Sequence, residues 1–103
     1  MIRRRVGDEF FLITQHDHAL LAGALAGHFG NDVFGAPEPR AGVVRATALH
    51  DCGWPLHDDR PTIHPKTREP LDVFEVSRPI ALRVWSASAD RAEAADAYAG
   101  LLT

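Results

Sequence analysis

The stretch that decides the fold is residues 13–31, ITQHDHALLAGALAGHFGN, because it carries the signals of a helix from its start to its stop. Thr14, followed by Asp17 three residues later, has the form of a capping box, which satisfies the free amide groups at a helix start. The alanines and leucines that follow favour helix, and Gly30 with Asn31 should end it. We therefore expect a helix that begins after Thr14 and stops near Gly30.

The spacing along this helix predicts which side chains meet the core. Residues three, four, seven and eleven positions apart share a helix face, so His18 lies with an apolar stripe and its ring should point inward. His16 is two positions away, about 200° around the helix, and should face solvent. The stripe consists of Leu21, Ala22, Leu25 and Phe29.

The segments on either side of this helix also have readable patterns. Residues 2–13 contain two short β-prone runs around Gly7, which predicts a small hairpin. After two prolines at positions 37 and 39, a second helix should run from about Arg40 to Asp51, with Gly53 as its C-terminal cap. Residues 53–72 hold four prolines and few apolar residues, which is typical of a long structured loop.

Two further helices are expected in the last third of the chain. One begins at Ser77 or Arg78, with Pro79 in its first turn, and ends between residues 92 and 95. Asp96 can cap a last helix, which the end of the sequence cuts off after little more than one turn. We expect the chain to be a C-terminally shortened form of something longer, whose exposed apolar residues self-association could bury. These residues are Tyr98, Leu101 and Leu102.

Composition narrows the class of protein. The chain has 103 residues, is 46% hydrophobic and 24% charged, and carries a formal net charge of −3, which fits one soluble globular domain over residues 1–103. Cys52 is the single cysteine, so no internal disulfide forms, and a reducing, cytoplasmic compartment is expected. No stretch approaches the roughly 20 apolar residues of a membrane span. The scattered basic residues give no footprint for nucleic acid.

The second helix ends in ALHDCGW, residues 48–54, where a histidine stands beside an aspartate. His50 shares a helix face with Val43, Ala46 and Thr47, and Asp51 flanks the same buried side. An aspartate in a last turn opposes the helix macrodipole, at a cost of about 0.3–1 kcal/mol, so a nearby cation should compensate it.

Two interpretations of these histidines stay open. In the first, His18, His50 and Asp51 hold a divalent metal, because imidazole nitrogens and a carboxylate oxygen suit manganese, iron, cobalt, nickel or zinc. In the second, both histidines are core residues, each hydrogen-bonded to a backbone carbonyl or to Asp51. Spacing alone does not choose between them.

The sequence resembles a superfamily and, more closely, a family, and both resemblances bear on whether these histidines bind a metal. HALLAGALA, from His18, followed by ATALHDCGW resembles the start of the HD-domain superfamily, in which a ligand histidine opens one helix and a His-Asp doublet ends a later one. Nearly the whole chain resembles a bacterial family of unknown function, DUF3891, through ITQHDHALLAGALAGHFGN, HDCGW, PKTREPLDVF and DAYAGLL. Members of that family continue past the point where this chain stops.

The HD resemblance implies a mainly α fold, an HD-like helical bundle behind the hairpin, with a metal held by His18, His50, Asp51 and a fourth aspartate from a later helix. Asp90, within SASADRA, is the best candidate because it follows the body of the third helix, whereas Asp96 is explained as a cap. Magnesium joins the candidate metals on this resemblance.

Binuclear HD proteins use additional histidines after the doublet. His57 and His64 lie in the corresponding region, but in a proline-rich loop we expect both to be solvated. Cys52 should behave as a small apolar residue, and Trp54 as a core or lid residue.

The implied chemistry is hydrolysis of a phosphate ester in a small molecule by metal-activated water. His16, His57, Asp58 and Arg60 are the remaining candidates for a proton carrier or a phosphate contact, and their spacing selects none of them. The sequence is compatible with an enzyme and with a protein that has no catalytic activity. The alternative is a non-catalytic helical binding or sensor module whose HD-like residues are structural.

Overall fold

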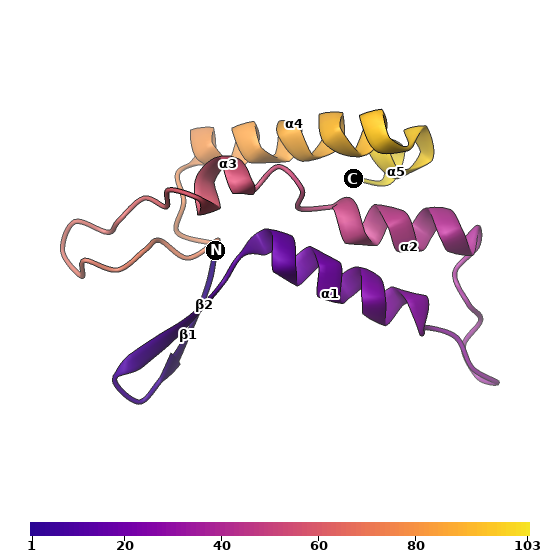
Figure 1. Cartoon of the computed structure of the whole chain (residues 1–103), viewed down its shortest axis with the longest axis horizontal. Helices are drawn as coiled ribbons and strands as arrows, with labels where there is room; N and C mark the ends of the chain where they lie inside the picture. Colours follow the sequence, from indigo (N-terminus) through magenta and orange to yellow (C-terminus); the bar gives the residue numbers. More distant parts are fainter.

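The fold is mainly α, as predicted, and helices make up about half of the chain. The computed structural model describes residues 1–103 and has overall extents of 48 × 32 × 18 Å. A two-stranded antiparallel sheet precedes five helices, and Figure 1 shows α1 and α2 lying side by side beneath α4. The elements are β1 (Ile2–Val6), β2 (Glu9–Ile13), α1 (Gln15–Gly27), α2 (Arg40–Leu49), α3 (Pro55–Asp58), α4 (Arg78–Ala95) and α5 (Ala97–Leu102).

The predicted N-terminal hairpin is confirmed. Strands β1 and β2 pair in register from Ile2 opposite Ile13 to Val6 opposite Glu9, and Gly7 supplies the left-handed backbone of the turn with φ of +63°. The hairpin projects away from the helices (Figure 1). Because an isolated hairpin is only marginally stable in water, its contacts with the rest of the chain matter for its persistence.

Helix α1 begins as the capping box predicts. Thr14 Oγ1 accepts a hydrogen bond from the Asp17 backbone N–H at 3.0 Å and donates one to the Asp17 carboxylate at 2.7 Å. The helix ends at Gly27, before the predicted stop at Gly30. The Arg40 guanidinium donates hydrogen bonds to the carbonyls of Gly27 and Phe29, which satisfies acceptors that a helix end leaves free.

The predicted apolar face of α1 is wrong. Its buried residues are Gln15, Ala19 and Gly23, while the large side chains of the predicted stripe are exposed. The reason is the close approach of α2: a Cβ placed on Gly23 would lie 2.6 Å from the Cβ of Ala48. Only small side chains fit between helices at that separation, so the large ones lie outside. The exposed members of the stripe are Leu21, Leu25 and Phe29.

Helix α2 ends at Leu49, two residues before its predicted end, and Gly53 is not its cap. His50 takes the capping position, and residues 51–54 form a turn that rests on α4. The Gly53 N–H donates to Ser88 Oγ at 2.9 Å, and a Cβ on Gly53 would lie 2.1 Å from the Val84 carbonyl oxygen. Gly53 is therefore needed for a close approach between two segments.

Only part of the predicted loop is irregular, because it contains α3 and an isolated bridge between Ile63 and Pro70. His57 lies on α3 and is 2% exposed, so its predicted solvation is wrong. Its ring packs edge-on against Trp54, and its Nε2 contacts Thr62. Cys52 is half-buried, as expected for a small apolar residue.

The predictions for the C-terminal helices are confirmed. Helix α4 starts at Arg78 with Pro79 in its first turn, and Asp96 Oδ1 accepts hydrogen bonds from the N–H groups of Tyr98 and Ala99. The core is small, since Trp54 and Val84 are its largest fully buried apolar side chains. None of the helices combines the length and the apolar character that crossing a membrane requires.

Candidate metal centre

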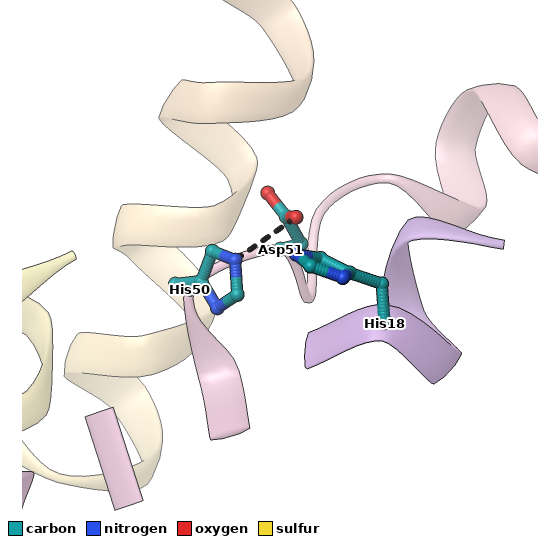
Figure 2. Close-up of side chains that lie close together, drawn as sticks. All are labelled: His18, His50 and Asp51. Atoms are coloured by element: carbon teal, nitrogen blue, oxygen red, sulfur yellow. Dashed lines mark ion pairs between the residues drawn. The ribbon is translucent and has the colours of Figure 1, made fainter. Parts of the chain in front are cut away.

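Three side chains of the ligand set converge between α1 and α2. His18 comes from the first turn of α1, His50 follows the last residue of α2, and Asp51 is the next residue in the turn. One ring nitrogen from each histidine and one carboxylate oxygen lie within 4.8 Å of one another. Figure 2 shows the His18 ring reaching from α1 toward the other two side chains. A histidine, a second histidine and a carboxylate form a donor set that first-row divalent metals favour.

The hydrogen bond of His50 fixes which ring nitrogen faces the cluster. Its Nδ1 lies 2.7 Å from the Thr47 carbonyl oxygen, which only accepts, so Nδ1 carries a proton. Its Nε2 lies 3.1 Å from Asp51 Oδ2 (Figure 2). In a neutral imidazole this nitrogen has a lone pair that faces the lone pairs of a carboxylate. A proton or a metal cation is therefore required between the two atoms.

Asp51 is nearly enclosed, with 8% of its surface exposed. Burial raises the pKa of the Asp51 carboxyl above its ordinary value, and electrostatic interaction with nearby His50 and His18 offsets part of that rise. Interaction with the buried indole of Trp54 also lowers the same pKa. A bound cation would stabilise the charged form of this carboxylate.

Other predicted site residues lie elsewhere. Asp90 is an exposed residue of α4 and is not a member of the three-residue cluster. His16 is half-buried rather than solvated, and its buried Nδ1 has no hydrogen-bond partner. The prediction for His16 followed the stripe of large apolar residues, which is not the face that packs.

Gln15 is a site neighbour that the sequence did not reveal. Its Nε2 donates a hydrogen bond of 3.4 Å to Asp51 Oδ2, and its Oε1 is buried with no partner. An uncharged amide at the first position of a helix carries no ligand signature. Ala19 and Gly23 are small residues four and eight positions after Gln15, and this spacing is the sequence signal that places Gln15 on the packed face.

The sequence profile of a family described as a protein of unknown function (DUF3891) matches residues 1–103. The chain belongs to the DUF3891 family. No curated protein and no solved structure matches it. Membership in DUF3891 confirms the predicted family resemblance and brings no reaction with it, so the chemistry of the site rests on its geometry.

A second polar pair in this DUF3891 chain is tied to the backbone. Asp58 Oδ1 accepts a hydrogen bond from the Met1 amine, and Oδ2 accepts one from the Gln15 N–H, both at 2.8 Å. Because Asp58 is 7% exposed and both of its oxygens are occupied, it anchors the start of α1 instead of meeting a ligand. His57, beside it, has a Nδ1 with no hydrogen-bond partner.

A surface cleft of about 380 Å³ opens beside the cluster of this DUF3891 chain. His50 belongs to both the cleft and the cluster. The remaining lining residues are Val43, Ala46, Thr47 and Leu102, and the first three share the face of α2 that the helical spacing assigned to His50. The cleft is large enough for a small molecule and is mainly apolar.

Proposed function

We propose that the protein binds a divalent metal ion through His18, His50 and Asp51 and hydrolyses a phosphate ester of a small molecule. The observation that carries the proposal is the convergence of three ligand atoms within 4.8 Å. Manganese, iron, cobalt, nickel, zinc and magnesium are the candidate ions, and the two nitrogen ligands favour a first-row transition metal over magnesium.

The donor atoms fit such an ion. The Nδ1–H of His50 is held by Thr47, which leaves Nε2 free to coordinate, and the buried Asp51 carboxylate lies 3.1 Å from that nitrogen. A divalent metal at this position would lower the pKa of coordinated water and neutralise charge on a phosphate oxygen.

Each residue then has a distinct role. Asp51 supplies the negative charge, the two histidines supply neutral ligands, and the Thr47 carbonyl holds the His50 ring in orientation. The apolar walls of the cleft next to His50 would bind the part of the substrate that does not react. These features favour an ester whose organic group is small and largely apolar.

The first test is metal content. Protein purified without chelator is analysed for bound metal, together with His50→Ala, Asp51→Ala and, as a matched control, His28→Ala at an exposed histidine outside the cluster. We expect close to one equivalent in the parent and in the control, and a large loss in the other two variants. Substoichiometric metal in the parent, unchanged by either substitution, would rule out the metal site.

The second test is turnover of phosphate esters by the metal-loaded protein. Phosphomonoesters and phosphodiesters with aromatic or short aliphatic groups are screened against parent and Asp51→Ala proteins. Activity confined to the parent supports the hydrolase. Activity that survives Asp51→Ala belongs to another site or to a contaminant.

A non-catalytic metal-binding module is the second candidate, and the lining of the cleft favours it. No lysine or arginine lines the cleft, so a phosphate there would meet no cationic side chain. Full metal occupancy with no turnover in the ester screen would select this function.

A further inference from the structure

The side-chain amide of Gln15 lies at the site with one of its polar atoms unpaired. Gln15 is 6% exposed, and its buried Oε1 meets no donor. A buried acceptor left without a partner costs about 1–3 kcal/mol, so such groups generally have a ligand or a water as partner. The Nε2 of the same amide lies against Asp51, which places the group at the edge of the His18, His50 and Asp51 cluster.

We propose that Gln15 is the fourth protein ligand of the metal site and coordinates through its side-chain oxygen. The inference rests on the metal binding proposed above. It fills the position that the HD resemblance assigned to an aspartate from a later helix, which Asp90 does not reach. The ligand set becomes two imidazole nitrogens, one carboxylate oxygen and one amide oxygen.

The distance to Asp51 supports direct ligation. The Gln15 Nε2 lies 3.4 Å from Asp51 Oδ2. Metal–oxygen bonds of about 2.1 Å place neighbouring ligand atoms about 3.0–3.4 Å apart, so this spacing already matches an edge of a coordination sphere. Rotation of the terminal amide by half a turn exchanges its nitrogen for its oxygen, and that torsion has a broad, roughly two-fold preference.

The negative charge of the Asp51 carboxylate explains why the amide nitrogen of Gln15 faces it. A carboxylate attracts an N–H donor, and the 3.4 Å hydrogen bond provides one. A cation attracts the amide oxygen instead, so binding would reverse the orientation of the group. The backbone of Gln15 is meanwhile held by Asp58 Oδ2 at 2.8 Å, so the reversal involves the side chain alone.

The sequence makes this reversal directly observable. Gln15 is the only glutamine and Asn31 the only asparagine, so the side-chain amide region of a nitrogen-15 spectrum contains two NH₂ groups. Asn31 is an internal control, because its Oδ1 accepts hydrogen bonds from Val33 and Phe34 in an exposed turn. Zinc is the probe, since it is diamagnetic and suits this donor set.

The experiment titrates zinc into protein uniformly labelled with carbon-13 and nitrogen-15, and into Gln15→Met, which keeps the length of the side chain and removes the oxygen. We expect the Gln15 side-chain carbonyl carbon and NH₂ signals to shift at one equivalent while the Asn31 signals stay fixed. In Gln15→Met, zinc affinity should fall about tenfold or more. The amide proton spectrum of the variant establishes that it remains folded.

The outcomes separate the two proposals. If zinc binds the parent, is lost in His50→Ala, and binds Gln15→Met within twofold of the parent, ligation by Gln15 is overturned and the metal site stands. An affinity loss without any shift of the Gln15 carbonyl carbon also overturns ligation, because the residue then acts only by orienting Asp51. Absence of zinc binding to the parent overturns both proposals.

Discussion

The rings of His18 and His50 meet edge to face, with centroids 5.6 Å apart and planes inclined at 79°, although 32 positions separate the two residues in the chain. This arrangement directs two imidazoles from different helices toward one carboxylate, that of Asp51. Packing of α1 on α2 therefore creates the candidate site, and neither helix contains it alone.

Replacing His18 tests whether the helix contact brings a ligand into the site. We expect His18→Ala to weaken zinc binding by at least about 100-fold, because even the loss of an outer-shell partner costs about 10- to 100-fold. The measurement is calorimetric titration, with the exposed His28→Ala variant as control. Equal affinity in both variants would remove His18 from the ligand set.

Asp51 should make the stability of the metal-free protein depend on pH. Burial raises the pKa of its carboxyl in the folded state above the ordinary value, so the folded protein gains stability from the protonated form at low pH and loses it as pH rises through that raised pKa. Asp51→Asn should therefore raise the melting temperature at pH 7, and the difference should shrink as pH falls below the ordinary range for aspartate.

Thermal unfolding across pH 3–7 in the presence of chelator measures this effect. In a domain of this size, each kcal/mol of free energy of unfolding changes the melting temperature by about a few degrees. Asp90→Asn is the control, because Asp90 is exposed on α4. If the melting temperatures of Asp51→Asn and the parent change in parallel with pH, the raised pKa of Asp51 is contradicted.

Gly53 should tolerate no side chain. In Gly53→Ala the added Cβ would meet the Val84 carbonyl oxygen at 2.1 Å and the Ser88 nitrogen at 2.5 Å, so the turn must move off α4. We expect a loss of about 1–3 kcal/mol in the free energy of unfolding. Gly35→Ala is the matched control, since nothing lies within 4 Å of a Cβ there, and should stay within about 0.5 kcal/mol of the parent. Chemical denaturation compares the two.

Arg3 joins the hairpin to the loop before α4. Its guanidinium contacts Glu69 at 2.8 Å and Glu75 at 2.9 Å, and its backbone N–H donates to Asp72. We expect Arg3→Met to cost about 1–2 kcal/mol and to speed hydrogen exchange across residues 62–75. Arg4→Met, at the exposed neighbour, should leave exchange in that loop unchanged. Similar exchange in both variants would show that the ion pairs do not hold the loop.

Signals confined to a few neighbouring residues predicted structure well. Thr14 with Asp17, and Asp96 with the residues after it, cap helices through contacts two or three positions away, so the sequence alone locates those helix starts. The helical phases of His18 and His50 select these two residues, with Asp51, as candidate ligands, and the three side chains do converge. The apolar stripe that assigned His18 to the core is largely exposed, however, so the position of His18 depends on how α1 packs on α2.

The predictions that failed depend on contacts between distant segments. The burial of His57 and the role of Gly53 depend on Thr62, Trp54 and α4, which no local pattern reports. Gln15 meets Asp51 across 36 positions, and a neutral amide gives no sign of it. Asp90 is a candidate by its residue type and its place in the order of helices, and neither of these reports which way α4 faces.

The contact of Gly23 with Ala48 has a consequence for how this protein can change over generations. Any larger residue at either position separates α1 from α2, and the separation moves the histidine of one helix away from the histidine and carboxylate that follow the other. Smaller replacements are unavailable at a glycine. Selection for the cluster should therefore keep the side chains at positions 23 and 48 small together, although neither residue supplies a ligand atom.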